Sequence, residues 1–387
     1  MRAQICMSRY FASGLLGLLS GAAFAASSTA TEDHIRRVQQ GIVPPVLVSG
    51  DVPVMKSVAA RMTELNVPGV SIAVIHEGRI EWARGFGVTG TGGAPVTANT
   101  LFQAASISKP VFALAVLRLV DGEKLNLDAN VNDYLKEWKL PDNDFTRQSK
   151  VTLRGLLSHS AGLTLHGFPG YAASTPLPTT VQILDGTPPA NTAAIRADIV
   201  PGTLVRYSGG GYLVAQHLLH DVTGVPLPKL MRDLVFAPLG MTRSTYEQPL
   251  PMTRMSEIAL PHRADGKPVA GGPHTYPEMA PAGLWTTPTD LARYALGVRA
   301  SLAGKSTGVI SAKTARAMLT PVFNNQGLGP QVGGKTSRKF FAHDGGNEGY
   351  RCLLIAYEDG EGAVVMTNSD SGGELTGEIL RTIAYVY

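Results

Sequence analysis

A serine and a lysine one helical turn apart are the first residues in this sequence whose types and spacing could do chemistry. Ser106 and Lys109 stand in the string Ser-Ile-Ser-Lys, directly before Pro110 and an apolar run over 111–120. Pro110 suits the first turn of a helix, so both side chains are expected on one face at a helix start. A serine hydroxyl becomes a nucleophile when a base takes its proton, and a lysine can be that base if burial lowers its pKa. The pair predicts a nucleophilic serine with a lysine base. A helix-capping serine beside a solvated lysine explains the tetrapeptide alone more simply.

Two later segments favour the catalytic interpretation of Ser106 and Lys109 over the helix-capping one. Tyr207 is followed by Ser208 and three glycines over 209–211, which allow a tight turn close to a neighbouring segment. His343 begins the string His-Asp-Gly-Gly shortly before a predicted C-terminal strand. Taken singly, Tyr207 fits a packing aromatic and His343 a hydrogen-bonded loop residue. Their order and spacing therefore carry the argument.

The three motifs together resemble the serine β-lactamase and penicillin-binding family. Ser-x-x-Lys is followed after about 100 residues by Tyr-Ser-x, and after about 135 more by His-x-Gly. The closest branch contains class C β-lactamases, D-alanyl-D-alanine carboxypeptidases and the carboxylesterases that share their fold. The resemblance covers about residues 50–385 and is supported by the stretches 67–74, 151–163, 236–241 and 282–293.

The resemblance assigns roles to the residues of these motifs. Ser106 is the acylated nucleophile, Lys109 accepts its proton, and Tyr207 passes a proton to or from the leaving group. The oxyanion hole would come from two backbone N–H groups, those of Ser106 and Gly346, aimed at the developing charge. The resemblance implies a serine hydrolase without a cofactor. The substrate-binding residues that it implies are His343, Gly345 and Gly346.

Two departures from the family pattern bear on the substrate. Gly209 stands where the family usually has an asparagine, and His343-Asp344 replaces the Lys-Thr of the β-lactamase motif. Both put efficient penicillin hydrolysis in doubt. Export to the cell-wall compartment still favours β-lactam hydrolysis as the activity. A carboxylesterase or a D-amino-acid peptidase or carboxypeptidase fits the His343 motif as well. A penicillin-binding sensor without turnover is the non-enzymatic alternative.

The elements that must position these residues predict an α/β (α+β) architecture. Two β-rich runs with a turn between them occur near each end of the chain, over 70–88 and 352–367, and a final helix is expected over 373–385. The expected fold is one antiparallel sheet made from both chain ends and flanked by helices, with a mostly helical region inserted between them. Further helices are predicted over 52–65, 110–122, 126–137, 151–158, 211–223, 227–237 and 289–300, with an irregular loop over 167–200.

Other functional classes find less support. A net charge of +4 without a basic run gives no reason to expect nucleic-acid binding. Residues 158–162 lack the first glycine of a Gly-x-Ser-x-Gly nucleophile elbow. His217 and His220 are three residues apart, but no His-Glu-x-x-His string is present, so a zinc enzyme is disfavoured without being excluded. Cys352, inside an apolar strand, is expected to be a buried small hydrophobe.

The first 25 residues are predicted to be a secretory signal peptide. Arg2 and Arg9 precede a short apolar run over 11–19, and an Ala-x-Ala site ends at Ala25. The apolar run is shorter than the roughly 20 residues that span a bilayer, so no stable membrane anchor is expected after cleavage. Residues 26–50 are expected to form a polar lead-in and residues 51–387 the hydrolase domain, which would act on a small-molecule substrate in the periplasm or outside the cell.

Cleavage after Ala25 can be tested directly. If the full-length chain is expressed with its leader in a Gram-negative host, the exported protein should begin at Ala26. Edman sequencing or intact-mass measurement of the periplasmic protein checks this. A mature protein that begins at Met1, or activity confined to the cytoplasm, would contradict it.

Overall fold

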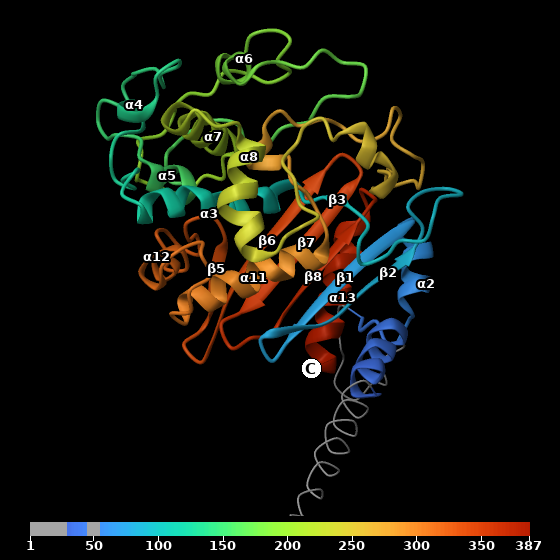
Figure 1. Cartoon of the computed structure of the whole chain (residues 1–387). Coiled ribbons are helices and arrows are strands. Elements are labelled where there is room, and N and C mark those ends of the chain that lie inside the picture. Colours follow the sequence, from blue (N-terminus) through green and yellow to red (C-terminus); the bar gives the residue numbers. More distant parts are fainter. Residues whose placement is uncertain (1–28, 45–54) are drawn as a thin grey trace, which may run out of the picture.

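A six-stranded antiparallel sheet built from the two ends of the chain forms the centre of the molecule. The computed structural model describes residues 29–44 and 55–387. The strands lie in the order β2-β1-β8-β7-β6-β5, and β1 pairs with β8, which joins the N-terminal hairpin to the C-terminal strands. Figure 1 shows the blue hairpin beside the orange and red strands. The predicted fold class is thereby confirmed. The strand bounds are β1 Gly69–His76, β2 Arg79–Gly87, β5 Gln331–Lys335, β6 Arg338–Asn347, β7 Tyr350–Tyr357 and β8 Gly362–Thr367.

Helices cover both faces of the sheet, because alternate residues of its central strands point to opposite sides. Along β8, Ala363 and Val365 pack with the C-terminal helix α13 (Gly372–Val386), whereas Val364 and Met366 belong to the larger core on the other face. Helix α11 (Pro288–Leu302) packs on that second face. Strand β1 is buried on both sides over 69–75, which explains its continuous apolar sequence.

The region between the two ends of the chain is mostly helical, as predicted, and it lies beside one face and one end of the sheet (Figure 1). One of its buried helices, α3 (Ser108–Asp121), is inaccessible over 108–117, which explains the apolar run in its sequence. Strand β3 (Phe102–Gln103) precedes α3 in the sequence. It pairs with β4 (Trp285–Thr286) to form a two-stranded sheet. The other helices are α2 Val58–Glu64, α4 Val131–Tyr134, α5 Leu153–Leu157, α6 Thr180–Asp185, α7 Gly209–Thr223, α8 Leu227–Met231, α9 Ala237–Leu239, α10 Met279–Ala282 and α12 Ala312–Met318.

Several elements differ from the sequence expectation. The polar lead-in contains a helix over 29–40, whose Ile35 and Val38 are buried in the second core with α2 and α13. The helix predicted over 126–137 is reduced to the single turn α4. Strands β5 and β6 and helix α12 were not predicted, and the irregular loop expected over 167–200 contains helix α6. The predicted leader, 1–25, lies outside the described residues. Among the described residues, no helix is both long and apolar enough to cross a bilayer.

Candidate active site

Ser106 lies in a tight turn that joins β3 to α3. It is the middle residue of a 3-10 turn, Ala105–Ile107, which runs directly into the helix. Ala105 adopts a left-handed conformation with φ of 48°, which costs a non-glycine residue about 1–3 kcal/mol. Such strain persists where the surrounding packing fixes the backbone, and Ala104 and Ala105 are both fully buried. The turn holds the half-buried Ser106 at the beginning of α3, as the sequence predicts.

Lys109 is buried one turn further on and is directed back to Ser106. Its Nζ lies 3.0 Å from Ser106 Oγ and donates a second hydrogen bond of 2.8 Å to the backbone carbonyl of Pro281, in α10. Burial lowers the pKa of Lys109 to about 7, although the nearby Asp344 carboxylate acts to raise it. A lysine with this pKa is neutral in a large fraction of molecules at pH 7 and can accept a proton.

Tyr207 completes the group at the start of α7. The next residue, Ser208, caps that helix by accepting a 3.0 Å hydrogen bond from Gly211 N. The Tyr207 ring lies between the rings of His159 and His166, with centroids 4.2 Å and 4.8 Å away. Burial raises the pKa of Tyr207, although its hydrogen bond with Ser106 acts to lower it. The phenol is therefore a neutral donor and acceptor beside the nucleophile.

Strand β6 brings the third motif to the other side of Ser106. Strand β5 pairs with β6 only as far as Ala342, so the residues that follow Ala342 can border the site. Gly345 lies against the nucleophile turn: a Cβ there would be 2.4 Å from Ala104 O and 3.1 Å from Ser106 N. This contact excludes every side chain at position 345. It also brings β6 up to the Ser106 backbone, and the pairing of the Ser106 and Gly346 N–H groups as an oxyanion hole stays a prediction.

His343 lies in β6 as expected, but its ring is buried behind the strand. Its Nδ1 lies 2.6 Å from Asp344 O, and its ring centroid is 6.1 Å from that of Tyr207. Burial, together with the nearby Lys109, lowers the pKa of His343 to about 4, so the ring is neutral at pH 7. The strand instead presents Asp344, Gly345 and Gly346 to the pocket. His343 thus supports Tyr207 from behind.

The site opens into a pocket of about 370 Å³. Lys109 is the single lysine among its lining residues in the described chain, Asp344 is the single carboxylate, and no arginine lines it. The pocket therefore offers the negative charge of Asp344 to a ligand, and burial leaves the Lys109 amine uncharged in a large fraction of the molecules at pH 7. The lining residues are Ser106, Lys109, His166, Gly167, Phe168, Tyr207, Pro281, Ala282, Gln331, Asp344, Gly345, Gly346 and Asn347.

Sequence reasoning missed the contribution of the loop before α6. His166 and Phe168 were placed in a loop without a role in the site, yet both line the pocket. A Cβ at Gly209 would lie 3.0 Å from the Phe168 ring and 3.1 Å from His166 O. Phe168 thus occupies the space into which the family's usual asparagine would project. The glycine at position 209 was the available signal that this loop packs closely.

Pro281 was also missed, because a backbone carbonyl leaves no signature in its residue type. Cys352 is buried as predicted, and its Sγ lies 3.0 Å from Ala104 O behind the nucleophile turn. Burial raises the pKa of this thiol, which keeps it protonated.

Comparison with known proteins agrees with the fold and the motifs. The beta-lactamase family profile matches residues 54–386, and the chain belongs to this family of serine hydrolases. A beta-lactamase of Lysobacter lactamgenus is 30% identical over 264 residues, which cover 66% of this chain and 62% of that protein. Esterase EstB of Burkholderia gladioli is 31% identical over 217 residues, which cover 54% of this chain and 53% of the esterase. The matches thus span about half to three fifths of these relatives.

Solved structures share the fold over nearly the whole chain. A D-amino acid amidase from Ochrobactrum anthropi SV3 superposes with a TM-score of 0.68 at 21% identity and covers 92% of this chain and 97–98% of its own. At this identity the likeness establishes the fold alone. Serine hydrolases of this family act without a cofactor.

The low pKa of Lys109 predicts the pH dependence of the reaction. The base must be neutral, so kcat/KM should fall about tenfold per pH unit below pH 7. Asp344→Asn removes a charge that raises the pKa of Lys109, so the acid limb should move to lower pH. Glu348→Gln is the control, because Glu348 is paired with Arg263 and does not line the pocket. Profiles on a neutral ester between pH 5 and 9 check this. A flat profile, or the same shift in both variants, would contradict it.

Proposed function

We propose that the protein hydrolyses small esters or amides through an acyl-enzyme on Ser106. The observation that carries the proposal is the 3.0 Å contact between Ser106 Oγ and the buried Lys109 Nζ, at the base of an open pocket. Burial lowers the pKa of Lys109 to about 7, which suits a general base near neutral pH. A helix-capping role for Ser106 does not account for a lysine buried against it.

The proposed reaction follows from the arrangement of these groups. Neutral Lys109 takes the Ser106 proton while Oγ bonds to the substrate carbonyl carbon. The oxyanion is held by the N–H groups of Ser106 and Gly346. The Tyr207 hydroxyl passes a proton to the leaving alcohol or amine as its bond to the carbonyl breaks. In the second step Tyr207 takes a proton from water as the water oxygen bonds to the acyl carbon. Lys109 returns a proton to Ser106 Oγ as the acyl bond breaks, which releases the acid and restores the Ser106 hydroxyl.

The charge in the pocket bears on the choice of substrate. Penicillins and cephalosporins carry a carboxylate close to the scissile amide, and the pocket lining offers Asp344 and no arginine. Like charges at short distance are repulsive, by several kcal/mol where water is excluded. We therefore place neutral and amine-bearing esters or amides ahead of β-lactams, whose hydrolysis stays a prediction from the sequence. Esterase EstB among the relatives supports this order, whereas the beta-lactamases among them support the alternative.

Two further parts of the proposal rest on the sequence. Action in the periplasm or outside the cell follows from the predicted leader. Turnover is favoured over a sensor role because a sensor needs acylation without deacylation, and Lys109 and Tyr207 both remain next to Ser106 to activate the second step.

The acyl-enzyme can be tested with Ser106→Ala. The variant should lose more than about 10³-fold in ester hydrolysis, because the nucleophile is absent. It should also lose covalent labelling by a fluorophosphonate probe, read by intact mass. Unchanged thermal unfolding would show that the pocket is intact. Labelling that persists and maps to another residue would sink the assignment, and a burst without steady turnover in the wild type would establish the sensor.

The electrostatic preference can be tested with three p-nitrophenyl esters of matched shape. The β-alanyl ester is cationic, the butyryl ester neutral and the succinyl ester anionic. We expect kcat/KM to fall in that order, after correction for the uncatalysed rates. Asp344→Asn should reduce the cation-to-anion ratio about tenfold, or roughly 1.4 kcal/mol. Glu348→Gln should leave the ratio unchanged. A wild-type preference for the succinyl ester would overturn the proposed charge preference while leaving the Ser106 mechanism in place.

A further inference from the structure

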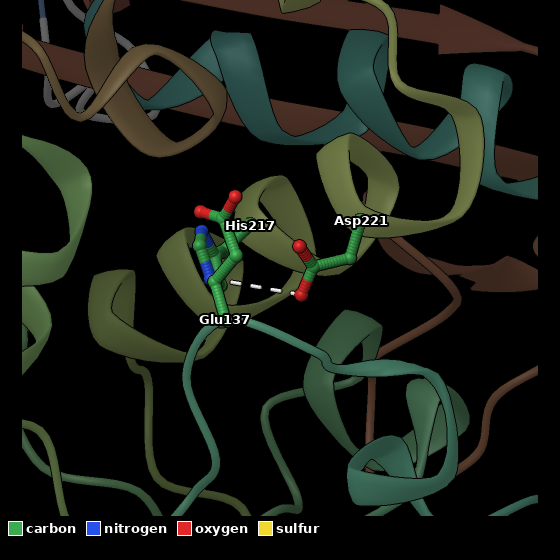
Figure 2. A group of neighbouring side chains, drawn as sticks. All are labelled: Glu137, His217 and Asp221. Carbon is green, nitrogen blue, oxygen red and sulfur yellow. Dashed lines mark ion pairs between the residues drawn. The ribbon is translucent and has the colours of Figure 1, made fainter.

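A second cluster of potential ligands lies on α7, away from the catalytic pocket. Glu137, in the loop after α4, meets His217 and Asp221 of α7, and one ligand atom of each lies within 4.8 Å of the other two. Figure 2 shows the three side chains converging, with the ion pair between His217 and Asp221 dashed. None of these three residues lines the pocket that contains Ser106. The cluster therefore needs an explanation of its own.

The imidazole of His217 points to a missing partner. Its side chain is 4% exposed, and its Nε2 has no hydrogen-bond partner. A buried nitrogen without a partner is destabilising, so such groups normally have one. The nearest carboxylate oxygen, Asp221 Oδ2, lies 3.7 Å away, which is beyond hydrogen-bonding distance. A cation between the two atoms would give the His217 nitrogen the partner that it lacks.

The charges and the access also suit a cation. Two carboxylates and a neutral imidazole carry two negative charges, against one positive charge on Lys136, whose ammonium donates to the Asp221 carbonyl. The backbone N–H of Lys136 donates to Asp221 Oδ2 at 2.6 Å, which orients this carboxylate as the supporting hydrogen bonds of metal ligands do. Glu137 and His217 line a cavity of about 330 Å³, which provides an entry path and room for water ligands.

We propose that Glu137, His217 and Asp221 bind a divalent transition-metal ion, zinc in the first place, as a structural site of the helical region. One nitrogen and two carboxylate oxygens suit zinc better than magnesium or calcium, which prefer oxygen alone. Ligand atoms of a tetrahedral zinc site lie about 3.3 Å apart at bond lengths near 2.0–2.1 Å. His217 Nε2 and Asp221 Oδ2 are already close to this spacing at 3.7 Å, and Glu137 is an exposed side chain whose carboxylate lies within 4.8 Å of both. The ion would crosslink helix α7 and the loop that follows α4. Helix α7 begins next to Tyr207.

Zinc binding by the purified, tag-free protein tests this proposal. After EDTA treatment and dialysis, ZnCl₂ should bind with one ion per chain by calorimetry and raise the melting temperature by at least about 2–4 °C. His217→Leu should weaken zinc binding at least tenfold. Its metal-free form should be as stable as the wild type or more stable, because the unpartnered nitrogen is gone. His220→Leu is the matched control: His220 lines the same cavity outside the cluster, and its variant should bind zinc as the wild type does.

Two milder variants keep the test decisive if His217→Leu does not fold. Asp221→Asn retains an oxygen that can accept the Lys136 N–H, and Glu137→Gln retains the exposed side-chain shape. Both should fold and bind zinc more weakly than the wild type. Absence of saturable zinc binding by the wild type would overturn the site. Equal binding by His217→Leu and the wild type would overturn it as well.

Discussion

A lysine amine enclosed in the protein interior is the constraint on which the rest of this structure depends. Removing a charged ammonium from water is costly, so the amine of Lys109 is stable there mainly in its neutral form or with fixed acceptors. The structure supplies Ser106 Oγ and Pro281 O at hydrogen-bonding distance. One of these acceptors is Ser106 Oγ, the proposed nucleophile. The burial that disfavours the charged amine therefore leaves a basic amine next to the oxygen that would react.

The elements around Lys109 are arranged to keep it dry and aligned. Helix α3 is buried over its first three turns, so the lysine cannot turn outward to solvent. Helix α10 contributes the Pro281 carbonyl, and β6 approaches so closely at Gly345 that no side chain fits between strand and nucleophile. Sheet formation from both chain ends makes this possible, since the pairing of β1 with β8 anchors the C-terminal strands. The site therefore depends on contacts between segments more than 170 residues apart.

The same geometry separates catalysis from substrate choice. Lys109 is buried and Ser106 and Tyr207 are half-buried, whereas Asp344 is exposed and borders the pocket. A charge at this position acts on the substrate and, through space, on the pKa of Lys109. One residue thus couples the preferred charge of the substrate to the pH range of the enzyme. The ligand cluster on α7 is separate from this coupling, and it bears on how firmly the helical region is held together.

The sequence by itself determined the family and most of the framework, and it singled out Ser106 as the proposed nucleophile. Ser-x-x-Lys before Pro110, and the apolar run behind it, predicted a helix that begins at the nucleophile, because these signals are local. The β-rich runs near both ends predicted a shared sheet for the same reason. The helix over 29–40 escaped notice because Ile35 and Val38 are apolar positions in an otherwise polar segment, and their burial requires α2 and α13. Strand β5 was missed because four of its five residues are partly or fully exposed and two are glycine.

Only the tertiary structure decided what the site residues do. His343 and Asp344 are neighbours in sequence, but alternation along a strand buries one behind Tyr207 and turns the other to the pocket. The Pro281 carbonyl enters the site from the short helix α10 and the Phe168 ring from a loop, and no local pattern specifies the path of either segment. The low pKa of Lys109 is likewise a property of its enclosure, which the order of residues in one segment does not contain. Residue types and their spacing indicate which local chemistry is possible. The burial of each group and the charge around it are determined by the segments that fold around the site.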